Sequence, residues 1–213
     1  MTDRSRAREL MEAALAEGRP LAWFEPLYAA AAAGEASVPW ADLVPNPMLV
    51  AWLDRESVGA GRALDVGCGY GDNAAELARR GLEVVGFDLS PSAVARARER
   101  FGDVAELVPG DVLAPPDAWR GAFDLVHETY TLQVLPPALR ARALAQLAEL
   151  VAPGGRLLVI CRGRDAGDPP GRMPWPLTRA ELEAIALPLE SFEDFFDDED
   201  PPVRRFRAVF RRG

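Results

Sequence analysis

Residues 62–72 read RALDVGCGYGD, an apolar run that breaks into three closely spaced glycines and ends on an acid. The residues that follow have the apolar spacing of a helix. A strand that runs into a glycine-rich turn and then into a helix is the opening unit of a nucleotide-binding α/β sheet. We predict that the ligand held by this turn organises the rest of the chain.

The composition is that of an acidic globular protein. The 213 residues include 33 acidic and 24 basic side chains, and every basic one is arginine. The net charge of −9 argues against binding to nucleic acid or to an anionic membrane surface. A chain of this length can bury a sizeable core.

The sequence shows no sign of secretion or of membrane insertion. No segment approaches the run of about 18 apolar residues that a membrane-spanning helix needs, and the N-terminal residues lack the apolar core of a signal peptide. With only two cysteines, Cys68 and Cys161, a disulfide framework, a four-cysteine zinc site and an iron–sulfur cluster are excluded. We expect a cytoplasmic protein.

Strands and helices are expected to alternate from residue 62 onward. The pattern predicts strands at 62–67, 83–88, 105–109, 123–129 and 156–161, helices at 72–80, 91–101 and 137–151, and a short helical piece near 117–119. A helix at 179–187 and a hairpin of strands near 189–196 and 204–211 follow, the acids of one strand pairing with the arginines of the other. Apolar strands joined by helices imply a parallel sheet covered on both faces.

The residues before the first strand are expected to form a helical cap. Helices at 3–17, 23–33 and 48–55 flank a proline-punctuated segment, 34–47, that carries Trp40. We therefore predict one domain, residues 1–213, in which residues 1–56 form a cap or lid over an α/β core, residues 57–213.

Three helix starts have recognisable sequence signals. Asn73 and Glu76 are spaced as in a capping box, and so are Thr178 and Glu181. Ser90 precedes a proline and is expected to cap the helix at 91–101.

The acid that ends the second strand, Asp88, stands where a carboxylate accepts hydrogen bonds from both ribose hydroxyls and repels a 2′-phosphate. The third glycine, Gly71, comes one residue earlier than in the GxGxxG turn of dinucleotide sites. Asp72, at the start of the helix, places negative charge where a pyrophosphate would lie. These features favour a cationic ligand without phosphate, such as S-adenosylmethionine, and leave an NAD-dependent oxidoreductase as an alternative.

The stretches LDVGCGYGD, VVGFDLSPSAV, VPGDVL, AFDLVHETYTLQVLP and VAPGGRLLVI follow one another between residues 62 and 163. In order and spacing they resemble the class I S-adenosylmethionine-dependent methyltransferases. Trp23 and Pro39-Trp40, ahead of the glycine turn, are similar to the thiopurine and small-thiol branch. The resemblance implies a Rossmann-like α/β fold with a mostly parallel seven-stranded sheet, an antiparallel last strand and a helical N-terminal cap.

The resemblance also implies roles for individual residues. The cofactor S-adenosyl-L-methionine would contact Trp23, Trp40, Asp65, Gly67, Gly69, Asp88, Leu89, Asp111, Val112 and Glu128. Asp65 and the glycines would hold its methionine end, Asp88 its ribose, Leu89, Asp111 and Val112 its adenine, and Glu128 would face the methionine moiety. The two tryptophans would fold over the cofactor; ordinary core packing is the alternative for both.

Candidate acceptor contacts follow the fourth and fifth strands. They are Tyr130, Arg162, Arg164 and Trp175, the last two in a loop, 163–177, rich in glycine and proline. The arginines would hold an acidic acceptor, or would form an ordinary solvated loop surface.

The choice of acceptor depends on whether the site contains a base, because an alcohol or phenol needs one and a thiolate needs little help. His127, the only histidine, is a candidate. Alternation along the strand, however, turns it away from Glu128 and into core packing. A metal site made by Cys68, His127 and Cys161 is a further alternative; we predict no metal.

We predict an enzyme that transfers the methyl group of S-adenosylmethionine to a small-molecule nucleophile, with a thiol as the first choice. It would bind neither nucleic acid nor membrane, and its catalytic residues and oligomeric state stay open. The alternative from another class is a catalytically silent S-adenosylmethionine-binding module with a regulatory or assembly role.

Overall fold

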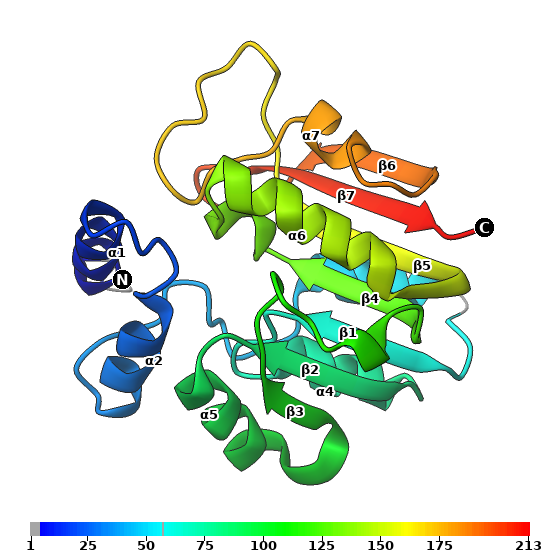
Figure 1. The fold of residues 1–213 in the computed structure, drawn as a ribbon, viewed down its shortest axis with the longest axis horizontal. Helices are drawn as coiled ribbons and strands as arrows, with labels where there is room; N and C mark the ends of the chain where they lie inside the picture. Colours follow the sequence, from blue (N-terminus) through cyan, green and yellow to red (C-terminus); the bar gives the residue numbers. More distant parts are fainter. Residues whose placement is uncertain (1–4, 57) are drawn as a thin grey trace.

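The computed structural model describes residues 5–56 and 58–213, and its centre is one seven-stranded sheet (Figure 1). The strands are β1 (Arg62–Val66), β2 (Glu83–Asp88), β3 (Glu106–Pro109), β4 (Phe123–Thr129), β5 (Val151–Arg162), β6 (Leu189–Phe196) and β7 (Arg204–Arg211). They lie in the order β3-β2-β1-β4-β5-β7-β6. β7 is antiparallel to both of its neighbours, and the other neighbouring pairs are parallel. The predicted fold class is confirmed.

The helices lie close to their predicted positions. They are α1 (Ser5–Ala16), α2 (Phe24–Ala32), α3 (Pro47–Arg55), α4 (Asp72–Arg79), α5 (Pro91–Phe101), α6 (Pro137–Leu150) and α7 (Arg179–Glu183), with 3₁₀ turns at Gly102–Val104, Asp117–Trp119 and Leu132–Val134. The helix expected at 179–187 ends earlier, at Glu183. Residues 3 and 4 of the first expected helix, and residue 57 at the expected start of the core, lie outside the described residues. None of the helices described is long and apolar enough to cross a membrane.

Two apolar cores cover the two faces of the sheet. Leu157 faces a core shared with α6 and α7, and its neighbour Leu158 faces a core shared with α3, α4 and α5. Successive side chains of a strand point to opposite faces, so a continuous apolar run fills both cores. This explains why β5 reads as unbroken Leu-Leu-Val-Ile and why helices lie on either side of the sheet in Figure 1.

Two of the predicted helix starts are confirmed. The Ser90 hydroxyl accepts a hydrogen bond of 3.1 Å from the Ala93 N–H. Thr178 and Glu181 form a complete capping box, each side chain accepting from the backbone N–H of the other residue. Both helices therefore begin where the sequence indicates.

The capping box predicted for Asn73 and Glu76 is wrong. Helix α4 begins after Gly71, whose φ of 85° is left-handed. The Asn73 side chain instead accepts the Asn46 N–H at 2.8 Å, which holds the start of α3 against the glycine turn. Glu76 pairs with Arg79, at the end of its own helix, and with Arg80, which follows that helix.

The predicted charge pairing across the last hairpin is confirmed. Arg204 forms a bidentate ion pair with Asp194, at 2.8 and 2.7 Å, and Arg207 pairs with Glu193. Arg207 also donates to the Met48 carbonyl oxygen at 2.8 Å. Strand β7 is therefore fastened to α3, at the base of the N-terminal region.

The N-terminal helices α1 and α2 lie beside the sheet, at the end where α5 begins (Figure 1). Trp23, Leu27 and Tyr28 form a small core there with residues of α1, with Val38 and with Ala93 of α5. Because this core is separate from the two sheet cores, the N-terminal region has its own packing. We call residues 5–46 the cap.

Candidate active site

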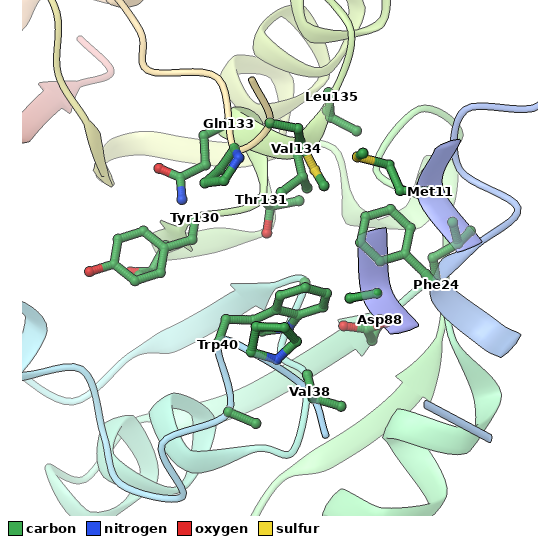
Figure 2. Close-up of a pocket in the computed structure, with 18 of the residues that line it drawn as sticks. Met11, Phe24, Val38, Trp40, Asp88, Tyr130, Thr131, Gln133, Val134 and Leu135 are labelled. Atoms are coloured by element: carbon green, nitrogen blue, oxygen red, sulfur yellow. The ribbon is translucent and has the colours of Figure 1, made fainter. Parts of the chain in front are cut away.

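A cavity of about 480 Å³ lies between the cap and the residues that follow β1, β2, β3, β4 and β5. In open α/β sheets this carboxyl end of the strands is where ligands bind. Figure 2 shows Phe24 and Trp40 of the cap on one side of it, with Thr131 and Val134 of the loop after β4 on the other. The volume is in the range of small-molecule and cofactor sites.

A second, smaller cavity of about 90 Å³ shares lining residues with the first. The glycine turn lines both cavities at this point. Gly67 and Gly69 have φ values of 65° and 52°. A Cβ on Gly67 would overlap the hydroxyl of Thr131, and one on Gly69 would lie 3.2 Å from the hydroxyl of Tyr28. The missing side chains thus leave a cradle whose rim is made by Thr131 and Tyr28.

Asp88 lies at the mouth of this cradle. One carboxylate oxygen accepts the Gly69 N–H at 2.9 Å and the other accepts the Ser90 N–H at 2.8 Å. Burial raises the pKa of Asp88 to about 6, although the two backbone hydrogen bonds oppose the shift. Each oxygen keeps a free lone pair, and Asp88 lines the cavity.

Leu89, Asp111 and Val112 line the same wall of the cavity. Leu89 is 39% exposed, and Val112 is buried. The Asp111 carboxylate accepts the Leu113 N–H at 2.8 Å, which fixes the loop after β3. Leu89 and Val112 could therefore pack against the face of a flat ring, and the Asp111 carboxylate could accept a hydrogen bond from its edge.

Aromatic side chains of the cap close the opposite wall. Trp23 and Trp40 both line the cavity, with their rings edge to face at 5.7 Å. The Trp40 indole N–H donates to the Tyr28 hydroxyl at 2.9 Å, and Trp23 stacks on Phe24 at 4.1 Å. The two tryptophans therefore pack together in the core of the cap and also face the cavity.

Asp72 borders the smaller cavity, but its charge is matched within the protein. Arg100 holds the Asp72 carboxylate with two hydrogen bonds, of 2.5 and 2.6 Å, and also donates to the Tyr70 carbonyl. Asp72 therefore lies at the start of the helix as expected, with its carboxylate paired to Arg100.

Asp65 is buried and does not line either cavity. The register of β1 against β4 places Asp65 beside His127, and Nδ1 of His127 lies 2.7 Å from the Asp65 carboxylate. The same imidazole lies 2.7 Å from the Thr129 hydroxyl through Nε2. His127 is itself fully buried, so it reaches the cavity through Thr129, which lines both cavities.

Glu128 also lies outside the cavity lining, on the other face of the sheet from His127. One of its oxygens accepts the backbone N–H groups of Thr131 (2.5 Å) and Leu132 (3.0 Å). Burial raises its pKa to about 8. In the free protein Glu128 therefore shapes the loop after β4.

The acceptor candidates divide into two groups. Tyr130 and Arg162 line the cavity, whereas Trp175 and Arg164 do not. Arg164 donates to the Pro176 carbonyl at 3.1 Å and pairs with Glu181. It holds the 163–177 loop against α7.

Other side chains line the cavity without a sequence signal for that role. They are Met11, Phe24, Tyr28, Thr129, Thr131, Gln133, Leu135, Met173 and Arg205, among others. Gln133, for example, accepts the Arg162 N–H at 2.8 Å, and the Arg205 guanidinium lies 4.8 Å from the Tyr130 ring. The positions of these side chains depend on contacts between distant segments, which the sequence does not reveal. Arg205 is missed because charge pairing across the hairpin already accounts for the basic run that contains it.

The structure does not support the cysteine–histidine metal site. Cys68 packs in the core shared with α3, α4 and α5, and Cys161 packs in the core on the other face. Among the described residues no group of three or more His, Cys, Asp or Glu side chains could hold a metal ion.

Comparison with known proteins finds a methyltransferase domain in the chain. The model of the methyltransferase domain family matches residues 63–155. Thiocyanate methyltransferase 1 of Arabidopsis thaliana is 29% identical over 188 residues, which cover 84% of the chain and 80% of the relative. Probable thiol methyltransferase 2 of the same plant is 28% identical over 156 residues, 72% of the chain and 68% of the relative.

A solved structure shares the fold over nearly the whole chain. The TehB-like S-adenosylmethionine-dependent methyltransferase from Corynebacterium glutamicum superposes with a TM-score of 0.62 at 23% identity, covering 94% of the chain and all of that protein. The family match, the related sequences and the strand order agree with one another. Residues 63–155 thus match a methyltransferase domain, and the related sequences support an S-adenosylmethionine-dependent methyltransferase enzyme that resembles class I in its fold.

Proposed function

We propose that this enzyme transfers the methyl group of S-adenosylmethionine to a small-molecule thiol inside the cavity beneath the cap. The observation that carries the proposal is the lining of that cavity. Gly67 and Asp88 lie on one part of its wall, and Tyr130 and Arg162 on another. Donor and acceptor would therefore meet in one enclosed space.

The residues present fit the cofactor. The cradle over Gly67 and Gly69 gives its methionine end a close approach to the backbone, since a Cβ on Gly67 would collide with Thr131. Asp88 keeps lone pairs for the two ribose hydroxyls. Leu89 and Val112 would lie against the adenine, with Asp111 accepting from its amino group.

Asp65 and Glu128 have indirect roles in this proposal. Asp65 is hydrogen-bonded to His127 and Glu128 to the backbone of Thr131 and Leu132. Each is buried below the cavity wall. Asp65 would support the β4 side of the site, and Glu128 would hold the loop that carries Thr131.

When bound, S-adenosylmethionine supplies a methyl group that its sulfonium sulfur already activates, so the protein's main task is to place the nucleophile in line. The aromatic wall of Trp23, Phe24 and Trp40 would exclude water from that step. Tyr130 and Arg162, with Arg205, would orient the acceptor. Residues 1–56 would form a lid over the α/β core, residues 57–213, of one domain. The enzyme would act in the cytoplasm, without nucleic acid or membrane.

Two observations favour sulfur as the nucleophile. Two similar proteins are named for the methylation of thiocyanate and of thiols. In addition, none of the described residues that line the larger cavity is a histidine or a cysteine, and lysine does not occur in the chain. A thiol needs less help from a base than an alcohol or a phenol does.

The test is turnover of methyl-labelled S-adenosylmethionine against matched thiols and phenols, each pair sharing the same carbon skeleton. We expect thiols to be methylated at least tenfold faster than the matched phenols or alcohols. Faster methylation of the oxygen acceptors, or no transfer to any thiol of the panel, would overturn the proposal. A Trp175→Phe variant serves as a control, because Trp175 does not line the cavity.

A further inference from the structure

Three side chains form a continuous hydrogen-bonded row from the buried sheet to the cavity. Asp65 is the penultimate residue of β1, and His127 and Thr129 lie two residues apart on β4, on one face of the sheet. The Asp65 carboxylate lies 2.7 Å from Nδ1 of His127, and Nε2 lies 2.7 Å from the Thr129 hydroxyl. Thr129 is the member of this row that lines both cavities.

The chemistry of the groups fixes the direction of these hydrogen bonds. An ionised carboxylate only accepts, so Nδ1 of His127 carries the proton and donates to Asp65. In a neutral imidazole Nε2 is then an acceptor, and the Thr129 hydroxyl donates to it. The Thr129 oxygen therefore presents free lone pairs to the cavity while its own proton points to His127.

Asp65 and His127 are both enclosed by the protein. Asp65 is 1% exposed, and its other carboxylate oxygen is buried without a hydrogen-bond partner. His127 is fully buried, so a proton from the cavity reaches it only through Thr129.

Resting on the proposed function, we propose that Thr129 takes the proton of a neutral thiol acceptor and relays its own proton to His127. The S–H bond breaks as its proton passes to Thr129 Oγ1, and the Thr129 proton passes to Nε2. The thiol sulfur's electron pair forms the new S–CH₃ bond. The old methyl–sulfur bond breaks, and its electrons stay on the donor sulfur; after product release the proton returns through Thr129 to solvent.

In this scheme Thr129 is a catalytic residue, whereas His127 and Asp65 are positioning residues that act through it. The relay accelerates methylation only of an acceptor that binds in its protonated form. An anion such as thiocyanate has no proton to lose and does not need the relay. The acceptor is therefore a thiol that is mostly protonated at working pH, as alkyl thiols are.

The test compares Thr129→Val with the wild type on two thiols at one pH near neutrality: an alkyl thiol, mostly protonated, and an aromatic thiol, mostly ionised. We expect kcat for the alkyl thiol to fall about 100-fold, because a positioned proton acceptor typically accelerates a reaction by about that factor. For the aromatic thiol the fall should be smaller by tenfold or more. Thr129→Ser, which keeps the hydroxyl, should restore the alkyl thiol rate.

A second measurement needs no turnover. The chain has one histidine, so ¹⁵N-labelled histidine gives an NMR spectrum of His127 alone. We expect Nδ1 to be protonated and Nε2 to be unprotonated and to accept a hydrogen bond. The ¹⁵N chemical shift of Nε2 should change in Thr129→Val. A proton on Nε2 in the neutral imidazole, or equal losses of kcat for the two thiols, would overturn the relay. If neither thiol is methylated, the proposed function fails, and the NMR measurement still decides whether the relay exists.

Discussion

Glu25 of the cap and Ser92 of α5 are joined by two hydrogen bonds: the Glu25 carboxylate accepts from the Ser92 N–H at 3.1 Å and from its hydroxyl at 2.6 Å. The hydroxyl of Ser90, two residues after Asp88, donates to the same carboxylate. Burial opposes ionisation, but these hydrogen bonds together lower the pKa of Glu25. The cap is thus attached to the segment that carries Asp88.

Replacing Glu25 by alanine should loosen the cap. The substitution leaves polar groups of Ser90 and Ser92 without their partner, which typically costs about 1–3 kcal/mol. We expect a lower melting temperature and weaker binding of S-adenosylhomocysteine by calorimetry. Glu12→Ala, which removes an exposed carboxylate of α1, is the control; equal behaviour of the two variants would contradict this role.

Binding of S-adenosylhomocysteine should depend on pH through Asp88. Its pKa in the free protein is raised to about 6, and ribose hydroxyls that donate to the carboxylate favour the ionised form. Affinity should therefore be full above pH 6 and should fall as the pH drops through 6. Calorimetry from pH 5 to 8 checks this. Asp88→Asn should bind about tenfold or more weakly and lack the pH dependence; a parallel dependence in that variant would show that another group titrates.

Gly67→Ala should be far more harmful than a comparable substitution elsewhere. Gly67 and Gly34 both have positive φ, 65° and 76°, so alanine is strained at either position. At Gly67 the new Cβ would also strike the Thr131 hydroxyl, whereas at Gly34 it would meet nothing within 4 Å. We expect both variants to lose about 1 kcal/mol or more of stability from strain, and Gly67→Ala alone to lose cofactor binding in calorimetry.

The stability of the enzyme should fall with rising pH because of Glu128. Its folded-state pKa of about 8 lies above the ordinary value of 4.5, so between these values the folded state holds a proton that the unfolded state has lost. The stability contributed is complete below pH 4.5 and is lost as the pH rises through 8, with a slope of at most about 1.4 kcal/mol per pH unit. Chemical unfolding of Glu128→Gln should lack this component; identical slopes in the two proteins would refute it.

The sequence predicts the parts of the molecule that depend on local structure. The turn at Gly67, the acid Asp88 and the capping box of Thr178 are each specified by residues a few positions apart, and the structure has all three. The alternating strands and helices likewise follow from short-range apolar spacing.

Features set by contacts between distant segments could not be predicted in this way. The pairing of Asp65 with His127 depends on the register of β1 against β4. Arg100 reaches Asp72 from the far end of α5. Strand β7 enters the sheet between β5 and β6, which brings Arg205 to the cavity.

The placement of the two cysteines matters for an enzyme that uses S-adenosylmethionine as a methyl donor. Both are buried, in cores on opposite faces of the sheet, and burial raises the pKa of each thiol well above its usual range. A protonated, enclosed thiol is a poor nucleophile. Neither cysteine therefore offers a competing nucleophile to the methyl donor or a ready partner for a mixed disulfide.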